Sequence, residues 1–229
     1  MKIGGLQKVS LSDYPGRISA VLFTQGCNFR CPYCHNPELV DPTRYGEILS
    51  EKEVLAYLEK RRGRLDAVTI SGGEPTLQPD LLSFTRQIRE YGYLVKVDTN
   101  GSCPDVLEKL FDAGLVDYLA MDIKGPPEKY QTITKSGIHQ STIRQSIDLI
   151  IASGVEYEFR TTVVKTLLNI EDFSGIAKLI KSARLFVLQA FVPSKALEGR
   201  FLTEAPFARD ELEQIRHSLE KDLFCVMIR

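Results

Sequence analysis

The stretch Cys27-Asn28-Phe29-Arg30-Cys31-Pro32-Tyr33-Cys34 places three cysteines within one short segment, in the spacing C-x3-C-x2-C. No fourth cysteine lies nearby, since the remaining two are Cys103 and Cys225. Three thiolates from one loop can hold three corners of a four-iron four-sulfur cluster. The fourth iron then keeps an open position, at which a small molecule can bind a redox-active metal.

Two other interpretations of this cysteine loop are weaker. A structural zinc site usually closes all four positions, and the fourth ligand here would be His35, which is poorly placed because it directly follows Cys34. A disulfide framework is typical of small secreted proteins, whereas this chain has 229 residues and an odd number of cysteines. The spacing favours the cluster, and zinc stays open as the alternative.

The composition is that of an ordinary globular protein, with 43% hydrophobic and 26% charged residues. The length suits one domain, since α/β barrels of this size are often undivided. A formal net charge of −1 gives no electrostatic sign of nucleic-acid binding. No signal-like apolar run precedes Gly16, and no stretch is long enough to span a bilayer. We therefore expect a cytoplasmic protein with neither nucleic acid nor membrane as a partner.

Strand-like runs alternate with helical patterns along the chain. The expected strands are Ile18–Thr24, Ala67–Ser71, Leu94–Asp98, Tyr118–Asp122, Tyr157–Val164 and Leu185–Phe191. The expected helices are Ser50–Lys60, Pro79–Tyr91, Pro104–Phe111, Ser141–Ala152, Glu171–Lys181 and Arg209–Leu219. Ser50 and Glu53 have capping-box spacing, and glycines follow four helical stretches, at positions Gly63, Gly92, Gly114 and Gly154.

This alternation predicts an α/β fold with a parallel sheet and right-handed crossovers. Six strand–helix units are too few for a closed eight-fold barrel, so we expect a partial (β/α)6 barrel of the TIM type. An open doubly wound sheet is the alternative. One domain over residues 1–229 is expected, with a core at about 17–192, an N-terminal extension at 1–16 and a C-terminal helix and strand within 193–229. Either architecture places functional residues at the carboxyl ends of the strands.

Polar and glycine residues gather at those strand ends. The cysteine loop follows the first strand, Ser71-Gly72-Gly73-Glu74-Pro75 follows the second, and Asp98-Thr99-Asn100-Gly101 follows the third. Asp122-Ile123-Lys124 ends the fourth strand, and Arg160 lies in the fifth. The two glycines let the backbone approach a ligand, and Glu74 adds a carboxylate suited to a ligand ammonium group. An ordinary glycine turn is the alternative for this segment.

Asp98 and Asp122 are expected near the centre of the sheet, where an unpaired charge is costly. Lys124 or a bound metal ion would compensate them. For Asp98 the alternative is a turn residue that caps Asn100-Gly101. Glu158 and Arg160 are two residues apart, so they lie on one face of a strand, where they can pair.

The cysteine loop, with Tyr33 before its last cysteine and Gly72-Gly73-Glu74-Pro75 one strand later, resembles the radical S-adenosylmethionine superfamily. Cys34-His35-Asn36, the Asp98–Gly101 segment and Asp122-x-Lys124 resemble its glycyl-radical-enzyme activases. The opening runs Gly5–Lys8 and Asp13–Gly16, which lead into Phe23–Cys27, resemble the activating proteins of anaerobic ribonucleoside-triphosphate reductase.

The resemblance implies a radical S-adenosylmethionine oxidoreductase with an iron–sulfur cluster. Such an enzyme cleaves S-adenosylmethionine reductively and generates a glycyl radical on a partner, here anaerobic ribonucleoside-triphosphate reductase. The electron would come from a flavodoxin- or ferredoxin-like donor. An enzyme that activates another glycyl radical enzyme, or acts on a small molecule as 7-carboxy-7-deazaguanine synthase does, is the alternative.

The resemblance also assigns residues to these groups. Cys27, Cys31 and Cys34 would ligate the cluster, and Tyr33 would contact the adenine. Gly72, Gly73 and Glu74 would receive the methionine amino group. The remaining cofactor-binding residues would surround the methionine carboxylate, the ribose and a monovalent cation, if one binds. They are Asp98, Asn100, Asp122, Lys124 and Arg160. Arg160 would also suit contact with the glycine loop of the partner protein.

The sequence departs from other activases in two places. The segment Leu188–Ser194 lacks the histidine that some activases carry after the sixth strand, so that contact is absent or replaced. The segment Asn36–Ser71 contains no cysteine, so we expect no ferredoxin-like insert. Four further residues are expected to have no functional role: Cys103 and Cys225 as core thiols, and His139 and His217 in helical regions.

Overall fold

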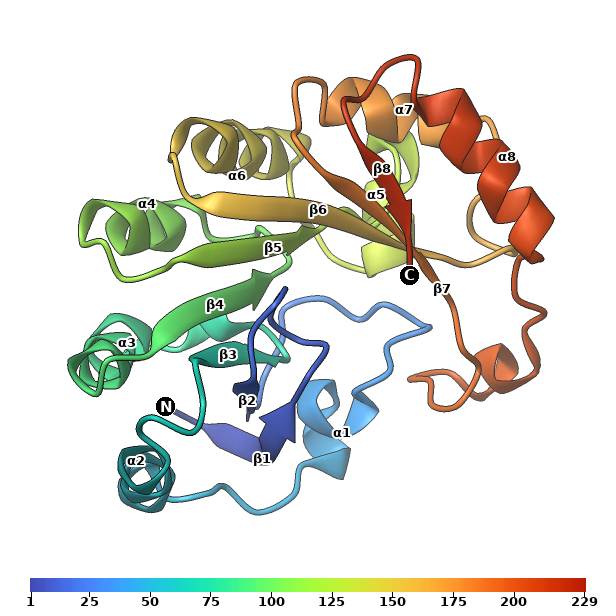
Figure 1. Cartoon of the computed structure of the whole chain (residues 1–229). Coiled ribbons are helices and arrows are strands. Elements are labelled where there is room, and N and C mark those ends of the chain that lie inside the picture. The colour runs from blue at the N-terminus through green and yellow to red at the C-terminus, as the bar shows by residue number, and fades with distance from the viewer.

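The computed structural model describes the whole chain, residues 1–229, and centres on one eight-stranded sheet. The strands lie side by side in chain order (Figure 1). They are β1 (Ile3–Ser10), β2 (Ser19–Thr24), β3 (Ala67–Gly72), β4 (Leu94–Thr99), β5 (Tyr118–Asp122), β6 (Glu156–Val163), β7 (Phe186–Ala190) and β8 (Val226–Ile228). All neighbouring strands are parallel except β1, which is antiparallel to β2.

The longer helices connect the parallel strands and lie along the outer face of the curved sheet (Figure 1). In chain order, the helices are α1 (Pro37–Val40), α2 (Glu51–Lys60), α3 (Leu81–Glu90), α4 (Pro104–Asp112), α5 (Tyr130–Thr134), α6 (Gln140–Ala152), α7 (Asp172–Leu179) and α8 (Arg209–Leu219). Four short 3-10 turns complete the chain: η1 (Pro42–Arg44), η2 (Pro75–Leu77), η3 (Pro127–Lys129) and η4 (Gly199–Thr203). None of the helices combines the length and the apolar character that crossing a membrane requires.

The predicted partial barrel is confirmed. Each of the six expected strands coincides with one of β2 to β7 to within two residues. A doubly wound sheet reverses its strand order at a switch point, whereas this sheet runs from β1 to β8 without a reversal. Edges remain at β1 and β8, so the barrel is open on one side.

Residues 1–16, expected as an N-terminal extension, contain β1, whose pairing with β2 runs from Ile3 opposite Thr24 to Ser10 opposite Ser19. The Ser50 side chain makes no capping hydrogen bond to α2, so the spacing of a capping box did not produce one. The predicted glycine stops are confirmed, because the four glycines that follow helices all have positive φ angles: Gly63, Gly92, Gly114 and Gly154.

The sheet has two chemically different faces because side chains alternate along each strand. Residues such as Val97, Leu119 and Phe159 are fully buried in the main hydrophobic core, which forms beneath the helices. Their strand neighbours Asp98 and Arg160 take the opposite face, inside the barrel. TIM barrels usually fill this interior with branched apolar side chains, so a charged interior indicates a site.

Candidate active site

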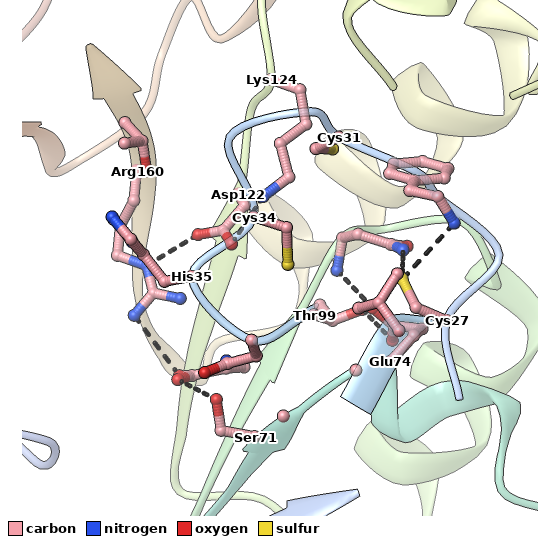
Figure 2. A pocket seen from close by; sticks show the side chains of 18 of the residues that line it. Cys27, Cys31, Cys34, His35, Ser71, Glu74, Thr99, Asp122, Lys124 and Arg160 are labelled. Carbon is pink, nitrogen blue, oxygen red and sulfur yellow. Dashed lines mark hydrogen bonds and ion pairs between the residues drawn. The ribbon is translucent and has the colours of Figure 1, made fainter. Parts of the chain in front are cut away.

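All twelve residues predicted for the site line one cavity of about 220 Å³ at the carboxyl ends of the strands. They are Cys27, Cys31, Tyr33, Cys34, Gly72, Gly73, Glu74, Asp98, Asn100, Asp122, Lys124 and Arg160. Figure 2 shows the cysteines on one loop, with Glu74 on one side of the cavity and Asp122 with Arg160 on the other. The topology therefore brings together side chains from five consecutive strands or their following loops.

The cysteine loop between β2 and α1 is held by its own backbone and by Arg30. The Arg30 guanidinium donates to the carbonyl oxygens of Cys27 and Phe29, at 2.6 and 2.8 Å. The Phe29 N–H points to the Cys27 sulfur at 3.4 Å, and the Asn100 amide reaches the same sulfur at 3.8 Å. Such N–H groups stabilise a thiolate, which is the form that binds iron.

The three thiols fit an iron–sulfur cluster by their chemistry. Burial raises the pKa of Cys27 to about 12 and that of Cys31 to about 11, and it also raises the pKa of Cys34. Thiolates in this setting need a cationic partner, because metal binding is what drives their deprotonation. No group of three or more His, Cys, Asp or Glu side chains is arranged to hold a single metal ion.

Tyr33 presents a buried hydroxyl at the same cavity. The ring packs edge-on against Phe191, with centroids 6.3 Å apart, and tilted against Phe201 at 6.5 Å. Its hydroxyl has no hydrogen-bond partner within the protein, although buried polar groups normally have one. A bound ligand would supply that partner, so the residues present fit an additional group in the cavity.

Gly72 and Gly73 fit together with the segment that leads into the cysteine loop. A Cβ atom at Gly73 would lie 2.2 Å from the carbonyl oxygen of Gly26, directly before Cys27. Gly72 has a φ of +112°, and a Cβ there would lie 2.4 Å from the backbone nitrogen of Thr24. Only glycine allows this approach, so the pair fixes the cysteine loop against the end of β3.

Glu74 is almost fully buried and joins the end of β3 to the end of β4. Its carboxylate accepts hydrogen bonds from the backbone and hydroxyl of Thr76, from the Thr99 hydroxyl at 2.7 Å and from the Asn100 N–H at 2.7 Å. Burial raises the pKa of Glu74, and these hydrogen bonds oppose the rise. The carboxylate thus positions Asn100 as well as facing the cavity.

Asp98 is paired with two cations inside the barrel. Its carboxylate lies 2.6 Å from Lys96 Nζ and 3.5 Å from an Arg160 nitrogen, and it accepts the Ser71 hydroxyl at 3.0 Å. Burial alone would raise the pKa of Asp98, but Arg160 and Lys96 hold it below its usual value. Asp98 does not cap the following turn, because Thr99 Oγ1 accepts the Gly101 N–H instead.

Asp122 lies between Arg160 and Lys124. Its two oxygens are 2.9 Å from Arg160 Nε and 3.0 Å from Lys124 Nζ. Burial disfavours the charge, yet the two cations lower the pKa of Asp122 to about 2. In return, Asp122 raises the pKa of both Lys124 and Arg160 against the effect of burial. All three groups therefore stay charged at neutral pH.

Several polar residues of this region were not predicted as site residues. Six of them line the cavity: His35, Asn36, Ser71, Thr99, Thr162 and Gln189. Lys96 is the closest partner of Asp98. A signal for two of them was present, because Thr162 and Lys96 each lie two positions from a predicted site residue and so share its strand face. Gln189 lies on β7, in the segment that lacks the expected histidine.

The residues expected to have no role lie outside the cavity lining. Cys103 and Cys225 are free and only half-buried, so the expectation of core thiols was wrong. His139 precedes α6 as its N-cap rather than lying within it, and His217 bonds the Glu213 carbonyl oxygen within α8. His35, which had no assigned contact, stacks on Phe191 with centroids 5.1 Å apart.

Comparison with known proteins agrees with this fold and site. Residues 21–180 match the family model of the Radical SAM superfamily. The chain is 36% identical to a Methanocaldococcus jannaschii protein assigned to the glycyl-radical enzyme activating enzymes, over 99% of this chain and 95% of that protein. It is 31% identical to a pyruvate formate-lyase-activating enzyme of Clostridium pasteurianum, over 80% and 77% of the two chains.

Two further matches cover less of the chain or share less sequence identity with it. A 7-carboxy-7-deazaguanine synthase of Methanothermobacter thermautotrophicus is 31% identical over 66% of this chain and 63% of that protein. A solved structure of TYW1 with a lysine–pyruvate adduct bound aligns with a TM-score of 0.64 at 17% identity, over 90% of this chain and 74% of that one. The structural match shows the shared fold alone.

The open barrel and its cysteine-lined cavity thus define an enzyme of the Radical SAM superfamily. Within that superfamily, the chain belongs to the glycyl-radical enzyme activating enzymes. Membership implies a four-iron four-sulfur cluster and S-adenosylmethionine as cofactors, and a glycyl radical enzyme as the protein on which it acts.

Proposed function

We propose that the protein generates a glycyl radical on anaerobic ribonucleoside-triphosphate reductase. The observation that carries the activase assignment is the cavity in which three cysteine thiols of one loop face the charged ends of β4, β5 and β6. The choice of this particular reductase rests on the opening runs of the sequence, residues 5–8 and 13–16, which resemble its activating proteins. We propose that the whole chain, 1–229, acts as one domain and works in the cytoplasm.

Cys27, Cys31 and Cys34 would hold the cluster and leave one iron open for S-adenosylmethionine. When bound and reduced, the cluster supplies the electron that cleaves the sulfonium into methionine and a 5′-deoxyadenosyl radical. The protein orients that cofactor and keeps water away from it. The Asn100 and Phe29 N–H groups support the Cys27 thiolate, and the Tyr33 hydroxyl, which is unpaired within the protein, would bond a polar group of the nucleoside.

Gly72, Gly73 and Glu74 would receive the methionine ammonium group at the end of β3. Glu74 also holds the Asn100 N–H, so its loss would affect both the ligand and the cluster loop. Arg160 and Lys124 would face the methionine carboxylate, since each is a largely enclosed cation that lines the cavity. Asp98 and Asp122 keep these cations charged and placed.

Two subsidiary roles follow from the same contacts. A monovalent cation, if one binds near Asp122, would compete with Lys124 and Arg160, which already occupy both of its oxygens. Gln189 would take the position of the missing histidine, because it is the polar residue of β7 that lines the cavity.

A flavodoxin- or ferredoxin-like protein would supply electrons to the cluster.

The test is a radical transfer assay under anaerobic conditions. The reduced protein with S-adenosylmethionine would be mixed with anaerobic ribonucleoside-triphosphate reductase or, in parallel, with pyruvate formate-lyase, and each sample examined by electron paramagnetic resonance. We expect a glycyl-radical doublet on the reductase. A doublet on pyruvate formate-lyase alone would replace the proposed partner, and a doublet on neither would remove support for both.

A small-molecule reaction is the second candidate, because similarity to the 7-carboxy-7-deazaguanine synthase covers two thirds of the chain. The substrate of that enzyme class would have to bind in the same cavity. Mass spectrometry of the small-molecule products formed by the reduced protein with S-adenosylmethionine and a pool of candidate heterocycles would detect 7-carboxy-7-deazaguanine. A deazaguanine product without a glycyl radical on either protein would favour this candidate over the activase.

A further inference from the structure

Arg160 is surrounded by three carboxylates but contacts only two of them closely. Its nitrogens lie 2.9 Å from Asp122, 3.5 Å from Asp98 and 3.9 Å from Glu158. Glu158 shares the inner face of β6 with Arg160 and its side chain is completely buried. A buried carboxylate without a closer cation would attract Arg160 away from the other two, because an unpaired buried charge is strongly unfavourable.

Arg229 supplies that closer cation. Its guanidinium forms a two-fold pair with Glu158, at 2.9 Å to Oε1 and 2.7 Å to Oε2. The Tyr118 hydroxyl donates to the same carboxylate at 3.1 Å. A planar guanidinium that meets both carboxylate oxygens forms the strongest type of ion pair, so Glu158 has little capacity left for Arg160.

Arg229 reaches the barrel interior because β8 docks against β7. Its backbone N–H donates to the Leu188 carbonyl oxygen at 2.9 Å, and its own carbonyl oxygen accepts the Ala190 N–H at 2.9 Å. Figure 1 shows β8 beside β7, the strand next to β6. The docking of β8 against β7 therefore places the Arg229 guanidinium inside the barrel, below the cavity.

We infer that the Glu158–Arg229 pair positions Arg160, leaving its guanidinium free to hold Asp98 and Asp122 and to face the ligand carboxylate. Arg229 is thus a positioning residue for the cofactor site rather than a contact to it. The consequence for S-adenosylmethionine rests on the proposed function, whereas the placement of Arg160 does not.

Substitution of Arg229 and Glu158, singly and together, tests this inference. Arg229→Met leaves Glu158 as an uncompensated carboxylate, which should draw Arg160 away from Asp122. In Glu158→Gln/Arg229→Met both charges are absent, so Arg160 should return. Glu158→Gln alone should change little, because Arg229 is partly exposed and can be solvated. Arg216→Met is the matched control, since Arg216 pairs with glutamates on the surface of α8.

Two readouts separate positioning from cofactor binding. The first is the Nε–H signal of Arg160 in nitrogen-15 nuclear magnetic resonance of the full chain before cluster assembly, assigned by its absence in Arg160→Lys. The second is equilibrium binding of S-adenosylmethionine to the cluster-loaded protein. We expect Arg229→Met to lose the slowly exchanging signal and to bind S-adenosylmethionine about tenfold more weakly, and the double variant to recover both.

The inference is overturned if Arg229→Met keeps the Arg160 signal, or if the double variant fails to recover it. If Arg229→Met does not fold, Arg229→Lys replaces it, because a lysine cannot form the two-fold pair with Glu158 and should therefore weaken the Arg160 signal; an unchanged signal in Arg229→Lys also overturns the inference. If the signals behave as expected while the wild type binds no S-adenosylmethionine, the positioning role stands and the proposed function fails.

Discussion

At the scale of single residues, the thiols of the cysteine loop differ from the other two cysteines by position. Cys27, Cys31 and Cys34 line the cavity, whereas Cys103 and Cys225 do not. Replacing any one of the first three with alanine should prevent stable assembly of the cluster and abolish S-adenosylmethionine cleavage. Iron and sulfide content, with 5′-deoxyadenosine release, would measure this. Cys103→Ala and Cys225→Ala are the controls, and loss of the cluster in either would show that the ligands are wrongly assigned.

Asp122 predicts a specific dependence of stability on pH. Its pKa in the folded protein is about 2, below the ordinary value of 3.8, because of Arg160 and Lys124. The ionised carboxylate therefore stabilises the fold above about pH 4, and this stabilisation is lost as the pH falls toward 2. The difference corresponds to about 2 kcal/mol in the free energy of unfolding.

Urea unfolding of the cluster-free chain across this pH range would measure the effect. The wild type should lose about 2 kcal/mol more than Asp122→Asn between pH 4 and pH 2, since the variant has no carboxylate to protonate. Equal losses in the two proteins would mean that Asp122 does not have the ion pairs described here.

At the scale of elements, the join between β3 and the cysteine loop is the most constrained contact of the site. A methyl group at position 73 would overlap the backbone of Gly26, which cannot move without carrying Cys27 with it. Gly73→Ala should therefore reduce iron incorporation severely, while the helices and strands remain folded by circular dichroism. Gly199→Ala is a matched control, because a Cβ there meets no atom within 4 Å. Full iron loading of Gly73→Ala would contradict the proposed rigidity of this join.

Adjacent positions on β6 separate packing from ligand binding. Phe159 is fully buried under the helices, whereas Arg160 faces the barrel interior. Phe159→Leu should lower the free energy of unfolding by about 1–2 kcal/mol and leave the affinity for S-adenosylmethionine unchanged. Arg160→Met should weaken that affinity by about tenfold or more. A large loss of affinity in Phe159→Leu would show that the two faces are not independent.

At the scale of the whole molecule, the sequence predicted the six central strands and most of the site. It did so because strands alternate regularly with helices, and because the carboxyl ends of parallel strands meet at one edge. A strand within 193–229 was expected and β1 was not, and neither edge strand was predicted to join the sheet. β1 contains two glycines and no clear alternation, and β8 has only three residues, so both depend on pairing with a neighbour.

Contacts between distant segments were also beyond the reach of one sequence. Glu158 and Arg229 are separated by 71 positions, and nothing in either local pattern indicates that they pair. For Lys96 the signal was only partial: it shares a strand face with Asp98, but a lysine inside a strand usually points to solvent, and its burial depends on the curvature of the sheet. The sequence motifs located the site, and the three-dimensional structure showed which of its charged groups pair with one another.

The central claim is that the three cysteines hold a cluster with one open iron that binds S-adenosylmethionine. The most direct measurement is the electron paramagnetic resonance spectrum of the reduced protein, recorded before and after S-adenosylmethionine is added. We predict that the cluster signal changes its g-values on addition, because the ligand occupies the open iron. A cluster signal that is identical with and without S-adenosylmethionine would contradict the account.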